Sequence, residues 1–258
     1  MFRSTTMSGR RRPLRSALGM VAALAIAVSG LTIGTIVSEQ TTTESASAAT
    51  AAGFDPGNII SDANFYNGSA MSGSSVQSFL NSVAPNCTQR SGGPKCLKNF
   101  TQNMSGISAV SGRCSAIAGG NKSAATIIAQ VGAACGISQK VLLVLLQKEQ
   151  GIVTTSSPTS YMYLHATGFA CPDTAPCDPA YYGFGQQVYA AALQFKRYQA
   201  SPTSWAYQAG RNNAILYNPN AACGRKTVYI KNQATAGLYI YTPYTPNAAA
   251  MANLYGTG

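Results

Sequence analysis

The most hydrophobic stretch beyond the N-terminal region lies between Ser138 and Gly151. Every residue from position 141 to position 146 is Val or Leu, and polar residues flank this run on both sides. Ser138 is a favourable N-cap and Gly151 suits the left-handed residue that ends a helix, so the pattern predicts a helix between them. The helix is too short to span a bilayer, and its apolar character predicts a buried, central position in a globular domain.

Apolar spacing of three and four residues predicts further helices, and one short run has the composition of a strand. The predicted helices cover residues 75–83, 123–134, 188–198 and 232–241, and the predicted strand or hairpin arm covers residues 227–230. Residues 84–122 are rich in Gly, Ser and Asn and are expected to form loops. The pattern therefore predicts a mainly α domain, built around the buried central helix, with little β structure.

The first 48 residues have the pattern of a secretory signal peptide. Arginines at positions 10, 11, 12 and 15 precede an apolar run over residues 17–37, and Ala46-Ser-Ala48 forms a cleavage site of the A-x-A type. The mature chain is then secreted, begins at Ala49, and is expected to keep no stable membrane anchor. It divides into a loop-rich lead-in (49–122) and a domain (123–258). A single continuous domain that includes residues 54–122 is the alternative.

Glu149 is the candidate catalytic residue of the central helix. At about 100° per residue it lies on the face of Leu142 and Leu145, and no other Glu follows the signal peptide. The leucines and the negative end of the helix dipole both disfavour a carboxylate, which predicts an acid that stays protonated near neutral pH. Such a group is the general acid that glycoside cleavage needs. The alternative is a carboxylate that reaches past the helix end to water or to a lysine.

The charge of the chain narrows the range of partners. The 258 residues include 18 Lys and Arg against 7 Asp and Glu, a net charge of +11. A cationic secreted protein is attracted to polyanions such as an anionic envelope polymer or a membrane surface. Because the sequence has no base-reading motif and no Lys/Arg-rich helix, nucleic acid is not expected. A cell-wall polysaccharide or another surface glycan is the expected partner.

Seven cysteines indicate an oxidising compartment. Their spacing favours three disulfides and leaves Cys223 alone, although spacing does not establish connectivity. The favoured pairs are Cys87 with Cys96, Cys114 with Cys135, and Cys171 with Cys177. The chain has no Cys-x-x-C pair and one histidine, so we expect no metal and no cofactor.

Residues 156–182 are the richest in polar and aromatic side chains. The candidate residues in this segment are Tyr161, Tyr163, His165, Asp173 and Asp178. A disulfide over the few residues between Cys171 and Cys177 predicts a rigid loop that places two carboxylates at the rim of a cleft. The alternative is that each Asp only stabilises a turn.

Four motifs along the mature chain carry a family resemblance. They are Phe54-Asp-Pro-Gly-Asn-Ile-Ile-Ser-Asp62, Val141-Leu-Leu-Val-Leu-Leu-Gln-Lys-Glu-Gln-Gly151, Thr167-Gly-Phe-Ala-Cys-Pro-Asp-Thr-Ala-Pro-Cys-Asp178 and Tyr241-Thr-Pro-Tyr-Thr-Pro-Asn-Ala-Ala249. Together they resemble a group of secreted actinobacterial proteins often labelled hemagglutinin-like, over Phe54 to the end of the chain. Members of that group continue into another Cys and an aromatic-rich tail, which would explain an unpaired Cys223. The label implies a carbohydrate-binding or adhesive protein.

A second, more distant resemblance concerns the chemistry. Glu149 at a helix end, Gly183-Phe-Gly-Gln186 and, loosely, Ala236-Gly-Leu-Tyr-Ile-Tyr241 resemble three motifs of lytic transglycosylases and goose-type lysozymes. The family usually has Ser where this chain has Gln150, and the gap between the first two motifs is long here. The resemblance implies a lysozyme-like domain.

This second resemblance implies a secreted glycosidase that cleaves peptidoglycan-type N-acetylhexosamine glycans by general acid catalysis from Glu149. In the resembled transglycosylases the N-acetyl group or the 6-hydroxyl of the substrate is the nucleophile, which suits a chain with one Glu. Alternatively Asp173 or Asp178 activates a water, which needs roughly 6.5–9.5 Å between the carboxyl groups. The expected sugar-binding residues are Gln186, Tyr161, Tyr163, Tyr241 and His165. The alternative function is non-catalytic carbohydrate binding on the same fold.

Overall fold

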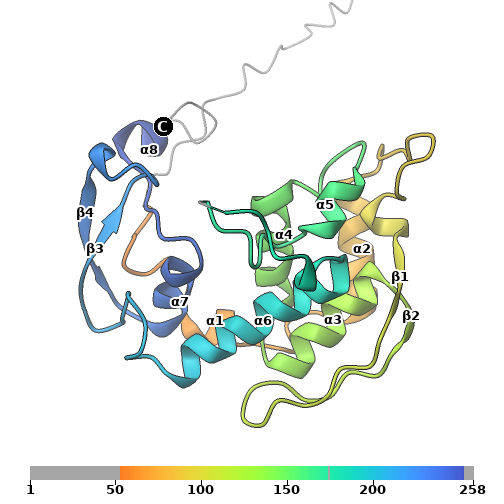
Figure 1. Cartoon of the computed structure of the whole chain (residues 1–258), viewed down its shortest axis with the longest axis horizontal. Coiled ribbons are helices and arrows are strands. Elements are labelled where there is room, and N and C mark those ends of the chain that lie inside the picture. Colours follow the sequence, from red (N-terminus) through yellow and green to blue (C-terminus); the bar gives the residue numbers. More distant parts are fainter. Residues whose placement is uncertain (1–52, 174, 253–258) are drawn as a thin grey trace, which may run out of the picture. The chain divides into compact units, whose positions relative to one another are not determined.

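The structure, a computed structural model, describes residues 53–173 and 175–252 (Figure 1). The predicted signal peptide lies outside these residues. In chain order the helices and strands are α1 (Asp62–Phe65), α2 (Gly73–Val83), β1 (Thr101–Met104), β2 (Gly120–Ser123), α3 (Ala124–Cys135), α4 (Gln139–Gln150), α5 (Ser160–Leu164), α6 (Phe184–Ala200), β3 (Arg211–Leu216), β4 (Arg225–Ile230), α7 (Gln233–Tyr241) and α8 (Ala248–Ala252). Short 3-10 turns occupy Leu97–Asn99, Pro179–Tyr181 and Ala221–Cys223.

Helix α3 is the helix around which the others pack. The Ser123 hydroxyl caps its first turn by accepting a hydrogen bond from the Thr126 N–H (3.1 Å), and Gly136 ends it in the left-handed conformation. It packs against α2, α4 and α6 (Figure 1). The prediction that α4 is the central helix is therefore wrong. The apolar run of α4 includes one outward position, Val144, whose side chain is 67% exposed.

Two small antiparallel sheets accompany the helices. Strand β1 pairs with β2, with Thr101 opposite Ser123, and β3 pairs with β4, with Arg211 opposite Ile230. The predicted fold class, a mainly α, lysozyme-like domain with little β structure, is therefore wrong, and the described residues form a mixed α and β fold. The strands β1 and β2 escaped prediction because their residues are polar and lack the apolar alternation of a half-buried strand.

The main hydrophobic core draws on residues from both sides of position 122. Phe65 and Leu80 lie in the same buried cluster as Ile128, Leu142 and Phe195. A smaller cluster lies between the β3–β4 sheet and α7, and consists of Ile215, Val228, Ile230, Ala236 and Tyr239.

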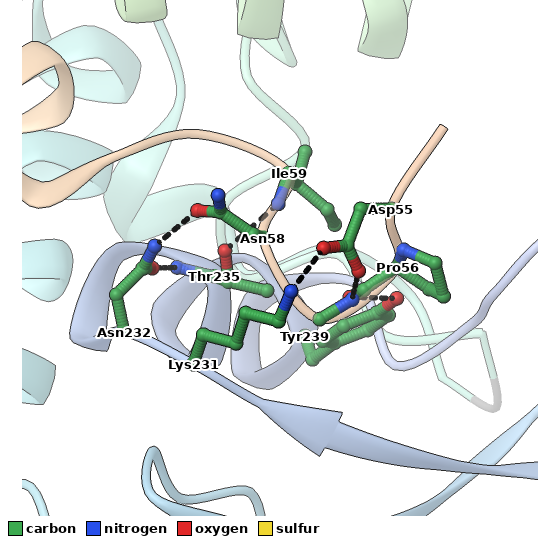
Figure 2. Close-up of polar contacts among 9 residues, drawn as sticks. Asp55, Pro56, Asn58, Ile59, Lys231, Asn232, Thr235 and Tyr239 are labelled. Carbon is green, nitrogen blue, oxygen red and sulfur yellow. Dashed lines mark hydrogen bonds and ion pairs between the residues drawn. The ribbon is translucent and has the colours of Figure 1, made fainter. Parts of the chain in front are cut away.

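Residues 53–60, which we call the N-terminal strap, lie against the end of β4 and against α7 (Figure 2). The backbone N–H of Lys231 donates to the carbonyl of Gly57 (2.8 Å), and the N–H of Ile59 donates to Thr235 Oγ1 (3.0 Å). These contacts join the first residues that the structure describes to elements much later in the chain.

The three disulfides have the predicted pairing. Their α-carbons are 6.0 Å apart in Cys87–Cys96, 4.1 Å in Cys114–Cys135 and 4.0 Å in Cys171–Cys177. Cys223 is exposed and forms no disulfide with the residues that the structure describes.

Candidate functional site

Glu149 lies in the last turn of α4, beyond the buried leucines. The buried residues of α4 stop at Leu146, and the side chain of Glu149 is 21% exposed. The ammonium group of Lys148 lies 2.7 Å from its Oε1 and 3.2 Å from Oγ1 of Thr242. The carboxyl group therefore has a cation beside it instead of the wholly apolar surroundings expected from the helix pattern. This is the lysine contact that we had considered as the alternative.

A glycine brings the loop after α5 against the Glu149 carboxylate. A Cβ atom on Gly168 would lie 2.7 Å from Glu149 Oε2, and Gly168 has a φ of +66°. Only glycine satisfies both conditions without strain. On the same loop, the carbonyl of Thr167 accepts a hydrogen bond from the hydroxyl of Tyr241 (2.8 Å).

Tyr241 lies within the electrostatic reach of Glu149. Burial raises the pKa of the Tyr241 hydroxyl, and the negative charge of Glu149 adds to this effect. Its ring stacks on Phe195 of the main core, with 4.9 Å between the centroids. We call Lys148, Glu149, Gly168, Tyr241 and Thr242 the Glu149 cluster. It joins three segments that are far apart in the sequence.

Gln187, a fully buried residue of α6, holds this loop in place. Its Oε1 accepts hydrogen bonds from the N–H groups of Thr167 (3.2 Å) and Phe169 (3.1 Å). Its Nε2 donates to the carbonyls of Phe169 (3.0 Å) and Tyr181 (2.9 Å). The side-chain amide of Gln187 thus satisfies backbone N–H and C=O groups both in the loop after α5 and at Tyr181. The predicted sugar-binding residue Gln186 is half-buried and makes no side-chain hydrogen bond to the residues that the structure describes.

Asp173 and Asp178 are exposed residues of the disulfide loop. The Tyr244 hydroxyl donates to Asp173 Oδ2 (2.7 Å). Asp178 Oδ1 accepts from the N–H of Ala180 (2.9 Å) and caps the 3-10 turn that follows. Asp178 therefore stabilises a turn, the alternative considered for it. Neither carboxylate makes a hydrogen bond or ion pair with a member of the Glu149 cluster.

The predicted sugar-binding aromatics divide into two groups. Tyr161 and His165 form a cluster with Tyr182, with ring centroids 4.1 and 4.6 Å from that of His165. Tyr161 is 59% and Tyr182 37% exposed, so this aromatic cluster has faces available to a ligand. Tyr163 instead lies in the core, stacked on Phe100 at 4.0 Å between centroids.

His165 also lies near the Cys171–Cys177 disulfide. The ring and the two sulfurs offer ligand atoms within 4.8 Å of one another. Metal binding by cysteine requires thiolates, and these two sulfurs are bonded to each other. The oxidised loop is therefore not a metal site.

Comparison of the chain with protein-family models, with curated proteins and with solved structures finds no match. Among residues 53–173 and 175–252, no helix is both long and apolar enough to cross a membrane. The three disulfides are typical of a protein that folds in an oxidising compartment. Function must therefore be argued from the Glu149 cluster and its surroundings.

Proposed function

We propose that the protein is a secreted enzyme that cleaves peptidoglycan-type N-acetylhexosamine glycans, with Glu149 as the proton donor. The Glu149 cluster is the observation that carries the proposal. A lone carboxyl group at a helix end lies against a glycine loop, which a buried glutamine fixes, and within the electrostatic reach of the partly buried Tyr241. Such a group is positioned before the substrate arrives, which is what general acid catalysis requires. Residues 49–258, the predicted mature chain, have 13 Lys and Arg against 5 Asp and Glu, and this net charge of +8 favours an anionic envelope polymer as partner.

The proposed reaction needs one protein carboxyl group. The Glu149 proton passes to the glycosidic oxygen as its bond to C1 breaks, and an oxygen nucleophile forms the new bond to C1. By analogy with the transglycosylases that the motifs resemble, that oxygen belongs to the N-acetyl group or the 6-hydroxyl of the substrate itself. The Glu149 carboxylate then recovers a proton from the 6-hydroxyl, or from the water that opens the N-acetyl intermediate. Tyr241 and the Gly168 loop position the carboxyl group.

Lys148 must leave Glu149 for this reaction to occur, because its ammonium group lies 2.7 Å from Oε1 and blocks the approach of a glycosidic oxygen. Its side chain is 52% exposed, so the pair is weakly held, and Thr242 Oγ1 offers a second partner at 3.2 Å. Lys148→Met should therefore retain cleavage. A complete loss of cleavage in this variant would instead give Lys148 a direct part in the chemistry.

Glu149→Gln tests the proposal, because it keeps the shape of the side chain and removes the transferable proton. Release of soluble muropeptides from purified peptidoglycan should fall by about 10² or more. Asp178→Asn is the matched control, since that carboxylate caps a turn, and Asp173→Asn tests the water-activating alternative. Full activity in Glu149→Gln would overturn the proposal. Anhydro ends in the products would indicate attack by the 6-hydroxyl, and reducing ends would indicate attack by water or by the N-acetyl group.

The second candidate is a glycan-binding protein without catalysis. The exposed rings of Tyr161 and Tyr182 favour it, because flat aromatic faces stack on sugars. In that case wild type and Glu149→Gln bind peptidoglycan equally and neither cuts it, whereas Tyr161→Ala weakens the binding. Co-sedimentation with the insoluble polymer measures all three proteins.

A further inference from the structure

Two apolar hollows lie side by side on the outer face of α4. The first has a volume of about 520 Å³ and is lined by Ile59, Val141, Leu145, Phe195 and Leu238, among others. The second has a volume of about 390 Å³ and is lined by Met71, Phe79, Leu143 and Val153, among others. Both volumes are in the range of small-molecule sites, and Glu149 lines neither hollow.

A ridge of α4 separates the hollows. Lys140 and Val144 line both of them, and Lys148 lines the first. These residues are four positions apart and so lie one above another along the helix, with Val141 on one flank and Leu143 on the other. The ridge thus has an apolar centre between two ammonium groups.

The ridge is exposed, and one of its lysines has no ion-pair partner among the residues that the structure describes. Val144 is 67% exposed, and at the walls Ile59 is 40% and Phe79 38% exposed. Lys148 is paired with Glu149, whereas Lys140 makes no ion pair with any residue that the structure describes. An exposed apolar surface beside a cation without an ion pair is suited to a partner that carries both apolar groups and an anion. The partner must offer apolar groups to both hollows and an anion to Lys140.

We propose that this face binds one anionic membrane lipid with two acyl chains. Its headgroup pairs with the Lys140 ammonium, and its chains lie on either side of Val144, one in each hollow. A sugar fills neither hollow with apolar atoms, and a single-chain amphiphile leaves one of them empty. The ridge shares Lys148 with the Glu149 cluster, but the proposed lipid contacts use Lys140 and the two hollows and do not depend on Glu149.

Calorimetric titration with dihexanoyl phosphatidylglycerol, below the concentration at which it forms micelles, tests the proposal. The full protein should bind one molecule. Dihexanoyl phosphatidylcholine should bind up to about fivefold more weakly, because its headgroup has no net negative charge for the exposed Lys140. Glycerol 3-phosphate, which has the anion without the chains, should not bind measurably.

Variants on the ridge locate the binding. Val144→Asp and Lys140→Glu should each weaken it about tenfold or more, and both positions are exposed, so the fold should survive. The matched controls are Tyr229→Asp, at a position 55% exposed on β4, and Lys226→Glu on the same strand; both should bind as wild type does. Thermal melting confirms that each variant is folded.

Several results would overturn the proposal. Equal weakening by Lys226→Glu would mean general attraction of anions to a cationic protein. Binding to anionic vesicles without binding to the monomeric lipid would mean contact with a bilayer surface instead of a lipid site. Self-association of the wild type that Val144→Asp abolishes would mean that a second copy of the chain covers the ridge.

Discussion

The N-terminal strap and the loop after α5 are both irregular segments fixed by polar contacts, but the strap combines buried anchors, Thr235 and Tyr239, with an exposed ion pair. The loop is held by Gln187, which has no exposed surface. The charged anchor of the strap is the pair of Lys231 and Asp55, whose side chains are 56% and 43% exposed (Figure 2). A hydrogen bond that water can replace contributes little, whereas a buried group that loses its partner has no substitute. We therefore expect the burial of each anchoring side chain to decide how much its contact contributes to the free energy of unfolding.

The largest effect is expected for Gln187→Leu. It leaves the N–H of Thr167 and carbonyls of Phe169 and Tyr181 without a partner, and each such group costs about 1–3 kcal/mol. We expect a loss of about 3 kcal/mol or more in the free energy of unfolding by urea. Gln186→Leu, one residue away and half-buried, should change it by less than about 0.5 kcal/mol. Equal losses in the two variants would contradict the role assigned to Gln187.

The next effect concerns the closest backbone contact of the strap. A Cβ atom on Gly57 would lie 2.2 Å from the carbonyl oxygen of Tyr229, a backbone atom of β4. Gly57→Ala should therefore push the strap off the sheet at a cost of about 1–3 kcal/mol. Hydrogen exchange at the N–H of Lys231, which donates to Gly57, should accelerate.

Gly73→Ala is the control for this variant. An added Cβ there meets only the methyl group of Ala129, at the ordinary distance of 3.8 Å, and helix α2 begins at this residue. Its stability should equal or exceed that of wild type. A stable Gly57→Ala with unchanged exchange would show that the strap has room to move.

A smaller effect is expected where the strap meets a buried hydroxyl. Tyr239, 2% exposed, donates to the carbonyl of Pro56 (3.0 Å). Tyr239→Phe removes the donor without creating a cavity, so we expect a loss of about 0.5–1.5 kcal/mol in urea unfolding. Tyr229→Phe, at an exposed position, should change nothing measurable. A larger loss in the exposed variant would reverse the proposed dependence on burial.

Local signals predicted much of the helical structure. The helix predicted over residues 123–134 matches α3, which Ser123 caps and Gly136 ends, Gly151 ends α4 in the left-handed conformation as predicted, and Asn232 caps α7. These features depend on neighbouring residues, which a linear pattern contains. Ser138 begins α4, but its side chain makes no capping hydrogen bond. The polar strands β1 and β2 form only because they pair with each other, which no local pattern indicates.

The candidate site was predicted less completely, for a related reason. The position of Glu149 at a helix end follows from local spacing, but Gly168 and Thr242 reach it only through the tertiary fold. The motif comparison selected Gln186 over Gln187. Helical periodicity would have favoured Gln187, because it shares a face with the buried residues Phe184 and Ala191.

The smallest effect is expected for the exposed ion pair of the strap. The hydrogen bond from Lys231 lowers the pKa of Asp55 below its usual value of 3.8, and the N–H of Gly57 adds to this shift. A carboxyl group whose pKa is lower in the folded state stabilises the fold above its unfolded pKa, and this contribution is lost as the pH falls through the folded value. The melting temperatures of wild type and Lys231→Met should therefore differ slightly at neutral pH and converge as the pH falls through the lowered pKa of Asp55.

Two further measurements show whether the effect of Lys231→Met comes from lost charge or from lost packing: melting at high salt, and melting of a control variant at a second lysine. Because the pair is exposed, about 1 M salt at neutral pH should remove the difference as acid does. Lys226→Met, on the same strand and without an ion pair among the described residues, should melt as wild type does under all conditions. A difference in melting temperature between wild type and Lys231→Met that persists in acid and at high salt would mean that the aliphatic part of the Lys231 side chain holds the strap by packing. Packing of Lys231 would then add to the buried hydrogen bonds of Thr235 and Tyr239 in holding the strap.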